Sequence, residues 1–219
     1  MNIAMSWHRD DGPGARRGYH HGNLREALIK AAIDLISEKG PGGFTFAEAA
    51  RAAGVSPAAP YRHFRDRDAL VADVAKQGFE AFTAALTAAW NNATPTPREA
   101  FSRVGNAYLE FARTKPAYYA AMFESGLSLA DYPEVRAVGD KAFGVLRQAC
   151  EAILEGVPKD KRPPAMMVSL HIWSLSHGIA SLFGRGDGAR RPIPMRAEDL
   201  LEAATLIYLE GLGISKDAG

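Results

Sequence analysis

Residues 44–64 read FTFAEAARAAGVSPAAPYRHF, and this stretch decides the fold. Thr45, with an acidic residue three positions later, has the capping-box pattern that begins a helix. Gly54 ends this short helix. Ser56 and the proline after it supply a capping oxygen and a first-turn proline for the next one. Two short helices around a tight turn predict a helix-turn-helix over residues 44–63.

The second helix of this unit is expected to be a DNA recognition helix. A major groove admits one α-helix, and the N-terminal residues of that helix face the base edges. Hydroxyls at helix starts suit phosphates, as does an arginine that opens the next helix. The apolar residues of the unit, Tyr61 among them, are expected to pack inward. The predicted DNA contacts are Thr45, Ser56, Pro57, Ala58, Ala59, Tyr61, Arg62, His63 and Arg67.

Residues 57–60 are poor in hydrogen-bonding groups. The two alanines there can only touch thymine methyls or lie close to the DNA. Pro60 has no backbone N–H, so we expect the start of the helix to be tighter or bent. Direct readout of bases then falls to Arg62, to His63 or to the N-terminal arm, and shape readout supplies the rest.

Residues 1–18 are rich in Gly, Arg and Asp without periodicity, which is typical of a flexible arm. Such arms reach the minor groove in other helix-turn-helix proteins. The arm contacts predicted on this basis are Arg16, Arg17 and His20. The alternative is that the arginines form only a solubilising tail.

Downstream, apolar residues recur at three- and four-residue steps, and no region alternates apolar with polar residues. The sequence therefore predicts an all-α fold with about nine helices. It divides into the arm, a DNA-binding domain over residues 19–66, and a ligand-binding and dimerisation domain over residues 67–219. The helical patterns of this last domain cover 66–89, 98–114, 116–125, 133–156, 163–184 and 197–212.

The composition is that of a packed protein. Net charge is +1, but residues 1–67 hold ten Lys and Arg against seven Asp and Glu. The basic end is thus the end with the motif. One cysteine excludes an internal disulfide, and no run of eighteen apolar residues predicts a membrane span. We therefore expect a cytoplasmic protein without membrane attachment.

The N-terminal third resembles a known family. YHHGNLREALIKAAIDLISEKG (19–40), FTFAEAARAAGVS (44–56) and PYRHFRDRDAL (60–70) are similar to the DNA-binding domain of TetR-family bacterial regulators. The resemblance implies a homodimer that binds a palindromic operator in double-stranded DNA. It also implies a small-molecule effector in the C-terminal domain, which changes the spacing of the two DNA-binding units. Most relatives are repressors, and a transcriptional activator of the same fold is the alternative.

The C-terminal part is similar to the WHG-type ligand-binding domain of one branch of that family. HIWSLSHGIASLF (171–183) carries Trp173, His177 and Gly178, and KPAYYAAMFESGL (115–127) also matches that branch. Large apolar side chains in this domain favour an apolar or aromatic effector. The candidate ligand residues are Tyr108, Phe111, Tyr119, Met122, Phe123, Trp173 and His177.

Helix 163–184 is apolar nearly all round, so it is expected to be buried on most sides. Its small residues, with the last helix, suggest a twofold four-helix dimer interface; the alternative is ordinary monomer core. The candidate interface residues are Ser174, Gly178, Ser181, Ala204, Ile207 and Gly211. His171 and His177 lie six residues apart and point to different faces of this helix, so no metal site is expected. We expect no cofactor either.

Two other classes of function compete with a regulator. An enzyme fused to a DNA-binding domain would need a nucleophile motif, a phosphate loop or a metal motif, and the sequence contains none. A nonspecific nucleoid protein would need a strongly basic surface, which a net charge of +1 argues against. We therefore expect no catalytic residues.

Overall fold

The computed structural model of the chain describes residues 24–184 and 193–214. These residues form helices joined by loops and contain no strand, which confirms the all-α prediction. Arg16, Arg17 and His20 lie outside the described residues. The helices are α1 Leu24–Lys39, α2 Phe46–Ala52, η1 Ala59–Arg62, α3 Arg67–Trp90, η2 Asn91–Ala93, α4 Pro97–Thr114, α5 Pro116–Phe123, α6 Pro133–Leu154, α7 Ala165–Phe183 and α8 Ala197–Gly211.

The described residues thus hold eight α-helices and two 3₁₀ turns, where the sequence predicted about nine helices. The difference lies in the helix-turn-helix, whose second helix is reduced to the 3₁₀ turn η1. The C-terminal helices begin and end within two residues of their predicted bounds. Prolines mark several of these starts, because a proline at the first helical position lacks only an N–H that would have no helical partner.

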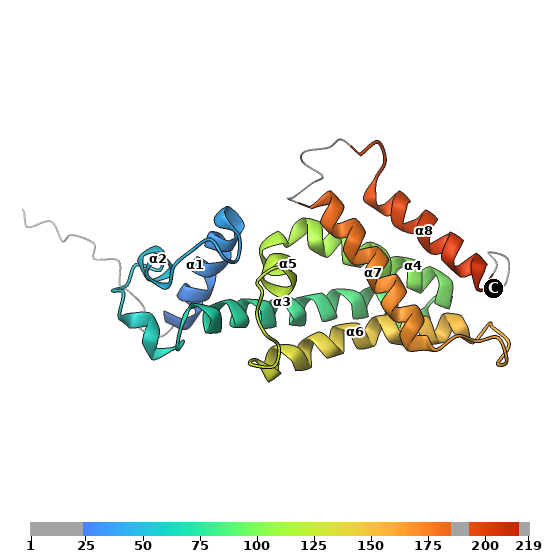
Figure 1. The fold of residues 1–219 in the computed structure, drawn as a ribbon, viewed down its shortest axis with the longest axis horizontal. Helices are drawn as coiled ribbons and strands as arrows, with labels where there is room; N and C mark the ends of the chain where they lie inside the picture. The colour runs from blue at the N-terminus through green and yellow to red at the C-terminus, as the bar shows by residue number, and fades with distance from the viewer. Residues whose placement is uncertain (1–23, 185–192, 215–219) are drawn as a thin grey trace, which may run out of the picture.

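The molecule is elongated, with a head (residues 24–66) at one end and a C-terminal bundle (α3 to α8) that makes up the rest (Figure 1). Helix α3 runs from the head through the bundle, packing against α1 and then against α4, α5 and α6. Gly78 lies where α5 crosses it. A Cβ there would come within 2.8 Å of the Met122 sulfur, so glycine is what allows the two helices to pack this closely.

Helices α7 and α8 form an outer pair on one side of the bundle. The prediction that α7 is buried on most sides is wrong for the single chain. One face, with Val168, Ile172 and Ile179, is buried, while Leu170 on the opposite face is exposed. The reason is that α7 packs on α4, α6 and α8 from one side only.

Length and apolar composition alone would let α7 cross a membrane. It is the only such helix in the described part of the chain. Its packing in the bundle indicates instead an amphipathic helix, whose exposed apolar side chains lie on the outside of the molecule.

Candidate DNA-binding surface and ligand cavity

The first helix of the helix-turn-helix begins with the predicted capping box. The Thr45 hydroxyl accepts a hydrogen bond from the Glu48 backbone N–H over 3.2 Å, and the Glu48 carboxylate accepts one from the Thr45 N–H over 2.7 Å. A hydrogen bond from Lys39, 2.7 Å long, is the main reason that the pKa of Glu48 falls to about 2. A phosphate at Thr45 would therefore meet an ionised carboxylate, which makes this predicted contact weaker than the sequence suggested.

The turn is built as the sequence predicts, but the recognition helix is not. Gly54 has φ +73°, which favours glycine. Residues 57 and 58 form a turn, and η1 follows as a single 3₁₀ turn. Pro60 explains this, because it cannot donate the fourth-residue hydrogen bond that would continue an α-helix from Ser56. The sequence predicted a second helix with a tighter or bent start, whereas the structure has a single 3₁₀ turn in place of an α-helix.

Pro60 also changes which side chain faces inward. Pro60 is fully buried, whereas Tyr61, expected to pack inward, is 64% exposed. Its ring lies edge-on to Phe46, with centroids 5.0 Å apart, and this contact fixes its direction. Arg62 and His63 are exposed beside it. Three side chains that can donate or accept hydrogen bonds therefore project from one short turn.

Arg67 has several partners within the head. Its guanidinium lies 5.2 Å from the centre of the Phe44 ring, bonds to the Pro41 carbonyl, and contacts Asp68 at 2.7 Å. These contacts tie the start of α3 to the loop after α1. The predicted phosphate contact of Arg67 would have to compete with them.

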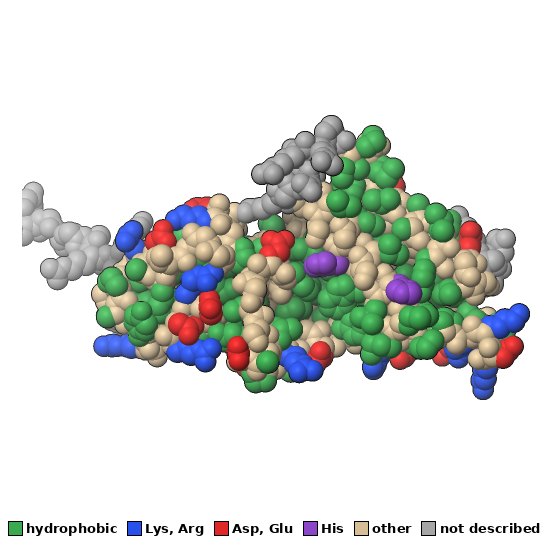
Figure 2. Space-filling view, in the orientation of Figure 1, with side chains coloured by type: hydrophobic (Ala, Val, Ile, Leu, Met, Phe, Trp, Pro, Cys, Tyr) green, Lys and Arg blue, Asp and Glu red, His purple; other side chains and the backbone are tan. Residues whose placement is uncertain are grey.

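The head is joined to the bundle by further arginines. Arg25 of α1 pairs with Asp73 of α3 and lies over the Phe64 ring at 5.4 Å. Arg65 donates to the hydroxyl of Tyr132 and lies over its ring. Tyr132 is buried where α6 begins. Basic side chains gather around the head in Figure 2.

An aromatic cluster occupies the bundle between α3, α4, α5 and α7. His177 lies at its centre: its Nδ1 is 3.0 Å from the Tyr108 hydroxyl and 2.9 Å from the Tyr119 hydroxyl. Burial lowers the pKa of His177, which favours the neutral ring with Nδ1 as an acceptor. Burial also raises the pKa of both tyrosines, so the hydroxyls keep their protons. The cluster is therefore uncharged.

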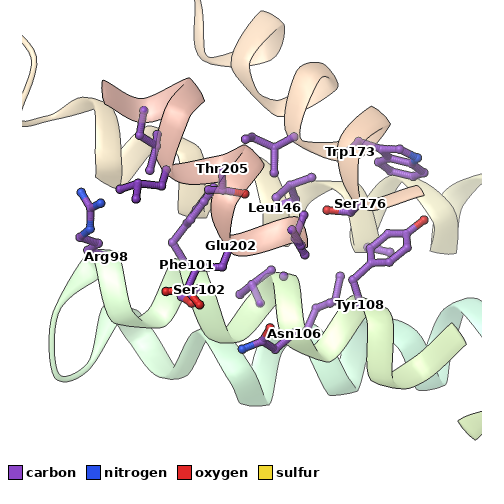
Figure 3. A pocket seen from close by; sticks show the side chains of 18 of the residues that line it. Arg98, Phe101, Ser102, Asn106, Tyr108, Leu146, Trp173, Ser176, Glu202 and Thr205 are labelled. Atoms are coloured by element: carbon purple, nitrogen blue, oxygen red, sulfur yellow. The ribbon is translucent and has the colours of Figure 1, made fainter. Parts of the chain in front are cut away.

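Beside this cluster lies a cavity of about 120 Å³, which we call the Ser176 cavity (Figure 3). Its walls come from α3, α4, α6, α7 and α8, and most are apolar. Tyr108 and Trp173 stand at one end, while Arg98 and Glu202 lie toward the other. The cavity can hold a small molecule that is largely apolar.

The structure divides the predicted ligand residues into two sets. Tyr108 and Trp173 line the Ser176 cavity. The other five belong to the layer of side chains behind it: Phe111, Tyr119, Met122, Phe123 and His177. Ser176 itself was missed. A signal existed, because it lies four residues after Ile172 and three before Ile179, on the buried face of an apolar helix.

A second hollow, of about 830 Å³, lies between the end of α1 and helices α4, α5 and α7. Tyr119 and Glu124 border it. Gly184 and Ile193 also border it, and they lie on either side of residues 185–192, which the structure does not describe. We therefore place the candidate ligand site in the Ser176 cavity.

The predicted dimer residues lie mainly on the outer surface. Ser174, Gly178 and Ser181 are exposed along α7, and Ile207 of α8 is 71% exposed. Ala204 is half-buried and Gly211 is exposed. No metal-binding group of His, Cys, Asp and Glu side chains occurs in residues 24–184 and 193–214.

Two family models match the chain. Residues 28–74 match "Bacterial regulatory proteins, tetR family", and residues 101–206 match "Tetracyclin repressor-like, C-terminal domain". No curated protein matches the sequence.

Solved structures resemble most of the chain. A protein of unknown function from Rhodococcus sp. RHA1 is 30% identical, with a TM-score of 0.73 over 89% of this chain and 98% of that one. The TetR-family regulator PfmR from Thermus thermophilus is 23% identical, with a TM-score of 0.64 over 87% and 98%. The fatty acid degradation regulator FadR from Bacillus halodurans is 16% identical, with a TM-score of 0.68 over 89% and 98%. The last two show a shared fold only.

Proposed function

The chain belongs to the TetR family of DNA-binding transcription regulators, which are not enzymes, and we propose that it is a repressor released from its operator by a small apolar or aromatic effector. The observation that carries this proposal is the course of α3. Its first turn contacts the head through Arg67, while Phe82 and Leu86 farther along line the Ser176 cavity. One continuous helix thus joins the DNA-binding turn to the ligand site.

On the DNA side, we propose that Tyr61, Arg62 and His63 make the principal contacts. They are exposed on one turn, and Arg62 is suited to both phosphates and guanine edges. Thr45 is exposed but hydrogen-bonded to Glu48, and Arg67 is bonded to the Pro41 carbonyl, so a phosphate would have to compete with these partners.

We propose that the active form is a homodimer joined through α7 and α8. The apolar face of this pair, seen over α7 and α8 in Figure 2, carries Leu170, Leu182 and Ile207 among its exposed side chains. A large exposed apolar patch is typical of a protein interface. A twofold dimer also matches a palindromic operator with half-sites about 34–36 Å apart.

The experiment is selection of bound sites from random double-stranded DNA, followed by footprinting and a reporter assay. We expect one palindromic footprint and reporter expression that rises when the regulator is deleted. A footprint spread over unrelated DNA would contradict sequence-specific regulation. Expression that falls on deletion would identify an activator instead.

A further inference from the structure

The Ser176 hydroxyl is a buried polar group that points into the cavity. The residue is 3% exposed, and Figure 3 shows its oxygen directed away from the helix toward the cavity interior. The hydroxyl has no hydrogen-bond partner among the described residues, and it is not one of their fully enclosed unpaired polar atoms, so its oxygen is open to the cavity. Two other serines of α7 differ, because Ser169 and Ser174 donate to carbonyls one turn earlier, over 2.7 and 2.8 Å.

Because the hydroxyl faces the cavity without a protein partner, a polar ligand atom placed there would complete its hydrogen bonding. The labelled side chains nearest to Ser176 in Figure 3 are Leu146, Trp173 and Tyr108, and the Tyr108 hydroxyl is already hydrogen-bonded to His177. A ligand oxygen at this position would therefore gain a hydrogen bond in a wall that is mostly apolar, whose other uncharged polar side chains besides Tyr108 are Ser102, Asn106 and Thr205. This makes Ser176 a specificity determinant.

The charged lining residues limit the ligand further. Arg98 and Glu202 are the only two among those that line the cavity, and their charges are opposite. The lining therefore carries no net formal charge. A charged ligand group buried between the aromatic walls would lose its hydration. The lining has no net opposite charge that would compensate for this loss.

The volume sets the size. A cavity of about 120 Å³ is comparable with an engineered cavity of about 150 Å³ that accommodates benzene in another protein. Two or more fused rings would not fit without rearrangement of the walls. The largest ligand expected to fit without such rearrangement is a single ring with a short substituent.

We propose that the Ser176 cavity binds small neutral monocyclic compounds with one hydroxyl or carbonyl oxygen, and that Ser176 hydrogen-bonds this oxygen. This inference rests on the proposed effector response and names the chemistry of the effector. A simple member of the class is 4-methylphenol. Toluene lacks its oxygen, and benzoate replaces it with a charge.

The test is isothermal titration of the DNA-free full-length chain with these three compounds. We expect 4-methylphenol to bind more tightly than toluene or benzoate. Ser176→Ala should weaken 4-methylphenol binding about three- to ten-fold, the usual net effect of one hydrogen bond, and leave toluene binding unchanged. Ser174→Ala, a matched change on the exposed face of the same helix, should alter neither. Circular dichroism melting checks that both variants fold.

The proposal would be overturned by absent 4-methylphenol binding, by equal binding to wild type and Ser176→Ala, or by tighter binding of benzoate. Operator release is measured separately, by fluorescence anisotropy of labelled operator. Binding that depends on Ser176 but leaves the operator bound would refute the effector response and retain the cavity chemistry. Release by 4-methylphenol that persists equally in Ser176→Ala would refute the role of Ser176 and retain the response.

Discussion

Arg65 donates a hydrogen bond from Nη2 to the hydroxyl of Tyr132 over 3.0 Å, across the boundary between the head and the C-terminal bundle. The guanidinium also lies 5.3 Å from the centre of the same ring. Helix α6 begins at the residue after Tyr132, and its Ala142 and Leu146 line the Ser176 cavity. The head is therefore connected to the cavity by α6 as well as by α3.

Tyr132→Phe should loosen the head while preserving the ring contact. Loss of one hydrogen bond is expected to raise amide exchange in α1 and α2 about two- to ten-fold, because local opening becomes easier. Exchange in α7 serves as the internal control and should not change. Hydrogen-exchange mass spectrometry makes the measurement, and unchanged exchange in the head would show that this bond does not hold it.

Arg62 and Arg67 should have different effects on DNA binding. Arg62→Ala is expected to weaken operator binding about ten-fold, to reduce the salt slope by about one and to alter the preferred sequence, with little change in Tm. The reason is that the Arg62 side chain is exposed on η1, so its removal disturbs little of the packing in the head. Anisotropy titrations at several salt concentrations and melting curves measure both properties.

Arg67→Ala should chiefly lower Tm, because it removes the contacts with Phe44 and the Pro41 carbonyl. The salt slope should stay near that of the wild type. A decrease in slope as large as that of Arg62→Ala would instead support the phosphate contact expected from the sequence.

Ile207→Glu should separate the proposed dimer. It places a carboxylate on the apolar face of α7 and α8, where pairing would bury it without a partner. Sedimentation should give a 23.6 kDa monomer, and operator binding should fall at least about ten-fold because one half-site is lost. Leu129→Glu, which changes an exposed apolar residue in the loop between α5 and α6, is the control and should leave a dimer.

Glu48 should make stability depend on acid pH. Its pKa is about 2 in the folded chain, against an ordinary value of 4.5, so its carboxylate stabilises the fold above about pH 4.5. That contribution decreases as the pH falls from about 4.5 and is lost as it passes through 2. Glu48→Gln should therefore be less stable than wild type at pH 7, and the difference should shrink across this window. Urea unfolding at a series of pH values measures it, and a constant difference would contradict the assignment.

The helices could be predicted because their signals are local. Capping by Thr45, glycine at position 54 and prolines at helix starts each act within one turn, so their consequences can be read from neighbouring residues. The 3₁₀ turn was harder. Pro60 gave the warning, but whether it would bend or replace the helix depends on how tightly it packs, and its complete burial is a tertiary property.

The sequence predicted which kinds of residue surround the ligand site, but not which of them line the cavity. Aromatic residues on α4, α5 and α7 do cluster, as their abundance suggested, yet only Tyr108 and Trp173 of the predicted set reach the cavity. Which side of an aromatic layer faces an opening depends on the angles between helices, and a single sequence does not encode these locally. The spacing of Ser176 on α7 indicated its burial, but its place at the cavity depends on how α7 packs against α4 and α6.

Helix α3 has a consequence for how little motion regulation requires. Its 24 residues span about 36 Å at 1.5 Å each. If a helix of that length tilts by about 5° at the cavity end, its other end moves through an arc of about 3 Å, close to the ~3.4 Å rise per base pair along the DNA axis. In a twofold dimer the two arcs run in opposite directions and add. A rotation small enough to leave the core of the bundle packed would thus move both heads out of alignment with the base pairs of their half-sites.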